Sequence, residues 1–450
     1  MAKLRIAPMF TGPVLVLAAC QAASASMPAA ATPTPSPRPL LTEDYARIGP
    51  LSPMPPQGTR ATPTTAPHTV LGPTPSPTHP LFRYPTPTGS PIPPIRHIDH
   101  GTQVTLHEIH MIDAESGWAF GGDLSSETHL LRTSDAGKTW RDVSPPVQGP
   151  EWGAFLDASG TFLDSQKARV VFYLPYPVRG PVQSLLIWKT DDGGQTWSST
   201  NAGDVYFIGL EWLSALVRFV DPDRGWIMIR HQRNGKVNDP VDLLATVDGG
   251  ETWEWISDYR SETLASCVKS GVTFGSALVG FATLEECPND VPVPVLEWTR
   301  DGGSTWEQAR LPMPKDSADL TDCGTRSPQF VSASRAVVGA SCRTGEGGGR
   351  VSLLFSTDDS GSTWKSLAYP GGDLLFIDSQ TGWAVDHNIY RTTDAGEHWE
   401  KVKTVSWSGQ FSFISPSLGW AVAHGDGTEA LVRTLDGGST WLLLKPFIGD

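Results

Sequence analysis

The 450-residue sequence predicts an all-β protein, a seven-bladed β-propeller with four antiparallel strands in each blade. Three observations lead to this prediction. An octapeptide recurs seven times, short apolar runs flank each copy, and 45 glycines with 39 prolines disfavour long helices. A unit of four antiparallel strands repeated radially is one blade of a propeller, so seven units predict a seven-bladed ring.

The octapeptide has the form Thr-x-Asp-x-Gly-x-Thr/His-Trp. An aspartate accepts hydrogen bonds from nearby backbone N–H groups and a glycine permits positive φ, so the pattern predicts a tight turn between two strands. The tryptophan that follows is expected to pack between neighbouring sheets. We therefore assign structural roles to seven aspartates and seven tryptophans, namely Asp135, Asp192, Asp248, Asp301, Asp359, Asp394 and Asp436, with Trp140, Trp197, Trp253, Trp306, Trp364, Trp399 and Trp441.

A second repeated element, a Gly-Trp pair after a strand and a short turn, precedes four of the octapeptides. Its tryptophans are Trp118, Trp226, Trp383 and Trp420. A further apolar run, such as 129–132 or 352–355, lies between this element and the octapeptide. Each unit thus contains a strand, a turn, a Gly-Trp strand, a loop, a third strand, the octapeptide turn and a fourth strand.

Residues 1–20 have the pattern of a signal peptide, with Lys3 and Arg5 before an apolar stretch that ends in Leu17-Ala18-Ala19-Cys20. The ending resembles the lipobox of bacterial lipoproteins, which implies that Cys20 carries the lipid. We expect an exported protein anchored to the outer face of the cell membrane, or to the outer membrane where the organism has one. The alternative is an ordinary signal peptide with a chance cysteine.

Residues 21–96 are rich in proline, threonine and serine. Proline fixes φ and removes a backbone donor, so this segment predicts a disordered, extended linker without a core. We interpret this segment as a stalk that holds the folded domain away from the membrane. The alternative is a disordered tail without a function. The propeller is then expected over residues 97–450.

Charge and motifs limit the function classes. The net charge is −14, and residues 1–96 carry seven basic against two acidic side chains, so residues 97–450 carry −19. An acidic domain is a poor partner for nucleic acid. The histidines show no His-Glu-x-x-His spacing, and neither a Gly-x-Ser-x-Gly elbow nor a phosphate-binding loop is found. We expect no metal, no cofactor and no catalytic residue set.

Four cysteines remain beside Cys20, an even number in an oxidising compartment. Three pairings are possible in principle. In blades four and five, one cysteine precedes the first expected strand and another follows the second, and antiparallel neighbours bring such positions together. We therefore predict the disulfides Cys267–Cys287 and Cys323–Cys342.

The octapeptide is similar to the Asp-box, or BNR repeat, of sialidase-type propellers. The combination Asp-x-x-x-Gly-Trp and then Arg-Thr-x-Asp-Gly-Gly-x-Thr-Trp resembles the photosystem II assembly and stability factor family, over about residues 100–445. This resemblance implies a seven-bladed scaffold that binds other proteins. Arg132, Arg391 and Arg433 match the arginines before the repeats of that family, but the other four copies carry Lys, Ala, Trp and Ser there. The photosystem partner is therefore not carried over.

We expect a non-catalytic platform that binds a protein of the cell envelope. The longer units of blades two to five, with segments 205–212, 231–239 and 314–322, are the expected binding face. Trp152, Tyr206, Trp212 and Tyr259 are candidate contact aromatics there, although burial is the commoner fate of such side chains. The alternative is a glycan-binding or glycan-hydrolysing propeller of sialidase or xyloglucanase type. A glycosidase should show a deep groove with paired carboxylates, whereas a scaffold should show a broad patch.

Overall fold

The computed structural model describes residues 95–123, 128–147, 156–174, 182–206, 212–232, 241–257, 268–286, 294–315, 320–345, 348–425 and 428–449. Cys20, the signal peptide and residues 21–94 of the linker lie outside this part. So do Trp152, Tyr259 and most of the three long segments of blades two to five. In the described part, no helix has the length and apolar character needed to cross a membrane.

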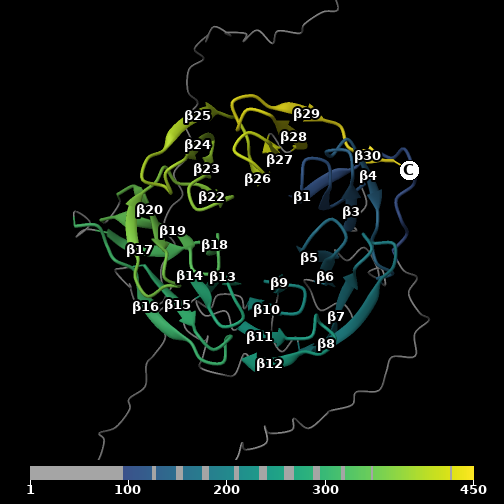
Figure 1. Ribbon diagram of the computed structural model, residues 1–450, viewed down its shortest axis with the longest axis horizontal. Coiled ribbons are helices and arrows are strands. Elements are labelled where there is room, and N and C mark those ends of the chain that lie inside the picture. The colour runs from purple at the N-terminus through teal and green to yellow at the C-terminus, as the bar shows by residue number, and fades with distance from the viewer. Residues whose placement is uncertain are drawn as a thin grey trace, which may run out of the picture. The chain divides into compact units, whose positions relative to one another are not determined.

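The described strands form seven sheets arranged as a ring, which confirms the predicted seven-bladed propeller (Figure 1). Blade 1 holds β1 (Thr105–Met111), β2 (Gly117–Gly122), β3 (His129–Thr133) and β4 (Thr139–Asp142). Blade 2 holds β5 (Asp157–Phe162), β6 (Ala168–Tyr173), β7 (Val182–Thr190) and β8 (Ser198–Tyr206). Blade 3 holds β9 (Trp212–Phe219), β10 (Gly225–Gln232), β11 (Val241–Thr246) and β12 (Glu254–Ser257). Blade 4 holds β13 (Val268–Phe274), β14 (Gly280–Glu286), β15 (Val295–Thr299) and β16 (Glu307–Arg310).

Blade 5 holds β17 (Leu320–Thr325), β18 (Gln329–Phe330), β19 (Ala336–Thr344), β20 (Arg350–Thr357) and β21 (Lys365–Ala368). Blade 6 holds β22 (Asp373–Phe376), β23 (Gly382–Asp386), β24 (Asn388–Thr392) and β25 (Glu400–Thr404). Blade 7 holds β26 (Ser408–Phe413), β27 (Gly419–Gly425), β28 (Thr428–Thr434) and β29 (Leu442–Leu444), and β30 (Phe447–Ile448) follows it. In each blade the first strand lies nearest the central opening and the last lies at the outside (Figure 1).

The Gly-Trp element explains how one blade packs on the next. The Trp420 side chain is fully buried, and its indole N–H donates to the carbonyl of Ala136 in the octapeptide of blade 1 at 2.9 Å. Trp383 donates to Gly437 in the octapeptide of blade 7 at 3.1 Å. The glycine before Trp420 must lack a side chain, because a Cβ there would lie 2.4 Å from the Phe413 ring.

The repeated octapeptide forms the same turn between the third and fourth strands of the blades. In blade 7, Thr434 and Thr440 donate their hydroxyls to the two carboxylate oxygens of Asp436 at 2.8 and 2.7 Å, and the Thr440 N–H donates to the same group. The hydrogen bonds from Thr440 lower the pKa of Asp436 to about 2. The Gly438 N–H donates back to Thr434, so the loop closes on itself.

An added strand joins the last blade to the first, and glutamine side chains join neighbouring blades at the inner edge of the ring. β30 pairs in parallel with β4, the outer strand of blade 1, so blade 1 gains a fifth strand from the end of the described chain. At the inner edge, the Gln410 amide of β26 pairs with both backbone groups of Ile109 in β1, at 2.8 and 2.9 Å. Gln329 of β18 binds both backbone groups of Phe376 in β22 in the same way.

The Cys323–Cys342 disulfide is present and joins β17 to β19 within blade 5, as the sequence predicts. Cys267 and Cys287 lie outside the described residues. Their described neighbours Val268 and Glu286 are direct partners in the β13–β14 pairing.

Candidate functional site

Two recesses among the described residues lie along the first and second strands of blades 5, 6 and 7. One has a volume of about 540 Å³ and lies between β17, β19 and β22. A second, of about 440 Å³, lies between β22, β23, β26 and β27. Asp373 and Leu374 line both, so the two adjoin at the start of β22. We call the two recesses together the trough.

Blade 5 leaves room for the trough because its inner strand is broken and its residues are small. β17 and β18 both pair with β19, and Pro328 in the interruption between them has no N–H to offer to a ladder. Gly324, Gly339 and Ser341 line the recess beside the break. A Cβ at Gly339 would lie 3.0 Å from the side chains of Leu374 and Tyr369, so a larger residue would crowd the wall against blade 6.

Two arginines line the first recess, and each is held by a neighbour. Arg326 follows β17 and donates to the carboxylate of Asp373 on blade 6 at 2.7 Å. Arg350 begins β20 and donates to the hydroxyl and carbonyl of Ser341 at 2.8 and 2.9 Å. The side chains of Arg326 and Arg350 are about half exposed (51% and 50%), so both guanidinium groups combine a fixed position with access from solvent.

The second recess brings a carboxylate and an imidazole together. Asp373 lines it from β22, and His424 lines it from the end of β27. The Glu429 carboxylate lies 3.2 Å from Nδ1 of His424 and 2.8 Å from Nδ1 of His107, across the seam between blades 7 and 1. An imidazole that is oriented through one nitrogen can exchange a proton through the other. The trough therefore contains groups able to donate and accept protons.

A second group of charged side chains lies on blades 1 to 3. Glu108 contacts Nε2 of His110 at 2.7 Å, and the Tyr173 hydroxyl donates to Asp157 at 2.9 Å. Burial raises the pKa of Glu108, but the contact with His110 and the charge of Arg218 outweigh it, so the pKa is lowered. Burial and the Asp157 charge raise the pKa of Tyr173, which keeps its proton.

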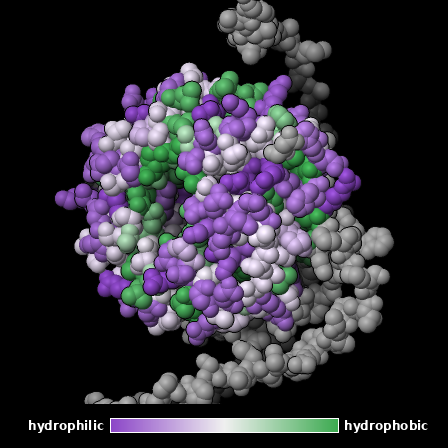
Figure 2. Space-filling view, turned by 45° about the vertical axis from the view of Figure 1, so that its right-hand side comes forward, coloured by the Kyte–Doolittle hydropathy of each residue, from purple (hydrophilic) through white to green (hydrophobic). Residues whose placement is uncertain are grey.

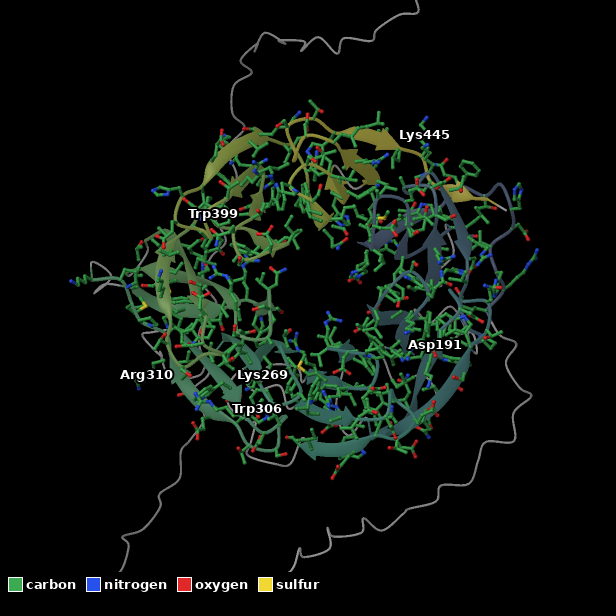
Figure 3. All side chains as sticks on the ribbon, viewed as in Figure 1. Asp191, Lys269, Trp306, Arg310, Trp399 and Lys445 are labelled. Carbon is green, nitrogen blue, oxygen red and sulfur yellow. A yellow bond between two sulfur atoms is a disulfide. The ribbon has the colours of Figure 1, made fainter. Side chains whose placement is uncertain are left out.

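Other ionisable pairs are buried inside the blades and have structural surroundings. Their contacts are His129–Asp142 at 2.8 Å, His231–Asp242 at 2.6 Å and Lys269–Glu297 at 3.4 Å. Lys269 lies inside the ring wall (Figure 3). Among the described residues, no group of three histidine, cysteine, aspartate or glutamate side chains is placed to hold a metal ion.

The octapeptide residues singled out from the sequence do not line the trough. Trp306 and Trp399 lie away from the central opening (Figure 3). The trough residues come instead from the first and second strands of blades 5, 6 and 7 and from Arg350 of β20, all outside the octapeptide, so the octapeptide pattern does not reveal them. Glu429 contacts both His107 and His424, which lie more than 300 residues apart in the chain, and no local spacing in the sequence shows this arrangement. Pro328 is a local sequence feature that could have indicated the break between β17 and β18, because proline has no backbone N–H for a strand pairing.

No protein-family model matches the chain, and no curated protein matches it. Solved structures of similar fold include the GH74 xyloglucanase from Xanthomonas campestris, with 12% identity and a TM-score of 0.46 over 78% of this chain and 55% of that one. The GH74 enzyme of Niastella koreensis has 13% identity and a TM-score of 0.36, over 75% and 62%. A PL25 ulvan lyase has 11% identity and a TM-score of 0.43, over 78% and 97%. The chain thus spans less than two thirds of either GH74 structure, and at these identities the likeness shows the fold alone.

These comparisons correct the expectation of a non-catalytic, protein-binding scaffold and the expectation that the chain is not an enzyme. Several of the solved structures of similar fold are carbohydrate-active enzymes: two GH74 enzymes, a PL25 ulvan lyase, an α-L-arabinanase and a GH93 α-L-arabinofuranosidase. The expectation also had a physical flaw. It asked only whether the seven octapeptides needed a catalytic explanation, whereas Arg326, Asp373 and His424 line recesses outside the octapeptides.

Proposed function

We propose that the trough binds a glycan and that Asp373 and His424 act on it as proton-exchanging groups. One observation carries this proposal: two recesses meet at Asp373, and polar side chains from three blades line them. A cavity of several hundred Å³ with a few convergent polar groups has the size and character of a small-molecule site. Two adjoining recesses suit a ligand built of linked units, as a glycan is.

Hydrolysis or elimination at a glycosidic linkage needs one group that takes a proton and one that gives it. Asp373 and His424 face the same recess from β22 and β27 and can share these tasks. Glu429 orients the His424 ring and acts as a positioning residue, because its carboxylate contacts Nδ1. The face of the molecule drawn in Figure 2 is largely hydrophilic, with hydrophobic residues gathered in a band on the left of the view.

The test is to incubate the purified protein with a panel of neutral and anionic polysaccharides and to measure shortened chains and new chain ends. Asp373→Asn and His424→Gln should abolish turnover without a large change in the thermal transition. Glu400→Gln, which alters an exposed carboxylate on the outer strand β25, is the matched control and should keep full activity. The proposal fails when the wild-type protein neither binds nor shortens any glycan of the panel.

Two sequence-based assignments accompany this proposal. The closed hydrogen bonding of the octapeptide turn supports its place in the Asp-box class. The pattern of residues 1–20 supports export and lipid attachment at Cys20, which would put the trough outside the cytoplasmic membrane, where cell-surface and environmental glycans are found.

A further inference from the structure

We propose that the trough selects an anionic glycan and that Arg326 and Arg350 hold its carboxylate or sulfate groups. This inference rests on the proposed function and names the class of substrate. The first observation is the charge of the residues that line the first recess. The chain carries a net charge of −14, yet the charged residues that line the first recess are two arginines and one aspartate. A concave site with the opposite sign to the rest of the surface concentrates the field on a ligand of matching charge.

The two arginines suit anionic oxygens in geometry as well as in charge. A guanidinium presents five N–H donors in a plane and binds carboxylate or sulfate oxygens in pairs. Arg350 donates from Nε and Nη2 to Ser341, which fixes the plane of the guanidinium group, and its Nη1 lies 3.7 Å from the Asp322 carboxylate. A donor group that is already ordered loses little freedom when a ligand arrives.

Arg326 is held by a contact that a ligand can replace. Its partner Asp373 has a side chain that is 72% exposed, and an ion pair this open to water is weakly stabilising. An anionic group of a bound sugar can therefore take the place of Asp373 on Arg326. The exchange frees the Asp373 carboxylate at the junction of the two recesses, the second of which His424 also lines. Binding of the anion and release of a proton-exchanging group are thus coupled through one arginine.

The disulfide gives the arginine site a rigid base. Cys323 and Cys342 join β17 to β19 directly beside Gly324 and Ser341, which line the same recess. Arg326 lies three residues after Cys323, so the cross-link limits how far its backbone can move. Arg350 is tied to Ser341, the neighbour of Cys342. Both arginines are therefore positioned from the same cross-linked pair of strands.

The test is calorimetric titration of the purified protein with three matched oligosaccharides at low and moderate salt. The first is an oligouronate, the second is the same chain with its carboxyl groups chemically reduced to neutral alcohols, and the third is that neutral chain after sulfation. We expect the oligouronate or the sulfated chain to bind at least tenfold more tightly than the neutral chain, with the difference narrowing as salt rises. The comparison of the two anionic chains shows which group the arginines prefer.

Three variants locate the effect. Arg326→Gln and Arg350→Gln should each weaken binding of the anionic chain at least tenfold and weaken binding of the neutral chain much less. Arg310→Gln removes the same charge from the outer strand β16 and should bind as the wild type does. Thermal unfolding of each variant shows that the ring is intact.

The inference is overturned when the neutral chain binds as tightly as its anionic counterparts, or when the two trough variants bind the anionic chain like Arg310→Gln. The proposed function survives that result if the neutral chain is bound and turned over in a manner that depends on Asp373. Absence of binding by every oligosaccharide, including those of the broader panel, refutes the proposed function itself.

Discussion

Replacing Gln410 by methionine tests how much the inner seam between blades 7 and 1 contributes to stability. The Gln410 amide pairs with the N–H and the C=O of Ile109, a residue that is completely buried. Methionine has a similar shape but offers neither partner, so both backbone groups lose their hydrogen bonds. Each loss destabilises by roughly 1–2 kcal/mol, which gives about 2–4 kcal/mol for the variant.

The expected shift in melting temperature follows from the size of the ring. With an unfolding entropy of about 2.1 cal/mol/K per residue, a domain of about 350 residues loses roughly 1.4 °C for each kcal/mol. Gln410→Met should therefore melt about 3–5 °C below the wild type by differential scanning calorimetry without ligand. Gln380→Met, at an exposed turn position between β22 and β23, is the control and should melt as the wild type does. Equal melting temperatures for both variants would refute the reasoning.

Four further predictions concern other parts of the chain. The N–H and imidazole contacts of His398 lower the pKa of Asp394 to about 2 from 3.8, so its contribution is complete above about pH 4 and is lost as the pH falls towards 2. Melting temperature measured against pH should fall in this window, and less so in Asp394→Asn. Ala395 has a φ of 65°, where glycine is relaxed, so Ala395→Gly should stabilise by roughly 0.5–1 kcal/mol in denaturant unfolding, and a destabilised variant would contradict this. Cys20→Ala should lose membrane association in cell fractionation, whereas unchanged partitioning would place the anchor elsewhere. Peptide mapping without reduction should find Cys267 joined to Cys287, and a link from Cys287 to any other cysteine would exclude that pair.

The ring could be predicted from the sequence because its construction repeats. The turn at Asp436 closes within eight residues, and the Gly419-Trp420 step packs by a steric rule that needs only local residue types. Because the same turn and the same packing step recur from blade to blade, their residue patterns recur in the sequence. Seven copies therefore predict both the blade and the number of blades.

The trough could not be predicted because its residues meet once and come from distant segments. Arg326 and Asp373 lie 47 residues apart, and His107 and Glu429 lie 322 residues apart. Their proximity depends on which blades are neighbours and on how the last blade meets the first. The sequence predicted seven units without showing the register of their inner edges, so a side chain such as Asp373 had no signal that set it apart from the other carboxylates.

The closure at β30 has a consequence for how this fold can be rearranged. Each four-stranded blade is made from one continuous stretch of chain, and residues 101–104 hydrogen-bond to residues 446–448, so the two ends of the ring are neighbours in space. A short peptide could therefore join the two ends of the ring. A new start could then be opened in any connection between blades, and every sheet would keep its strands. The order of the blades would then be cyclic, with no fixed first blade. Circular permutants that begin at blade 3 or blade 6 are therefore expected to fold into the same ring.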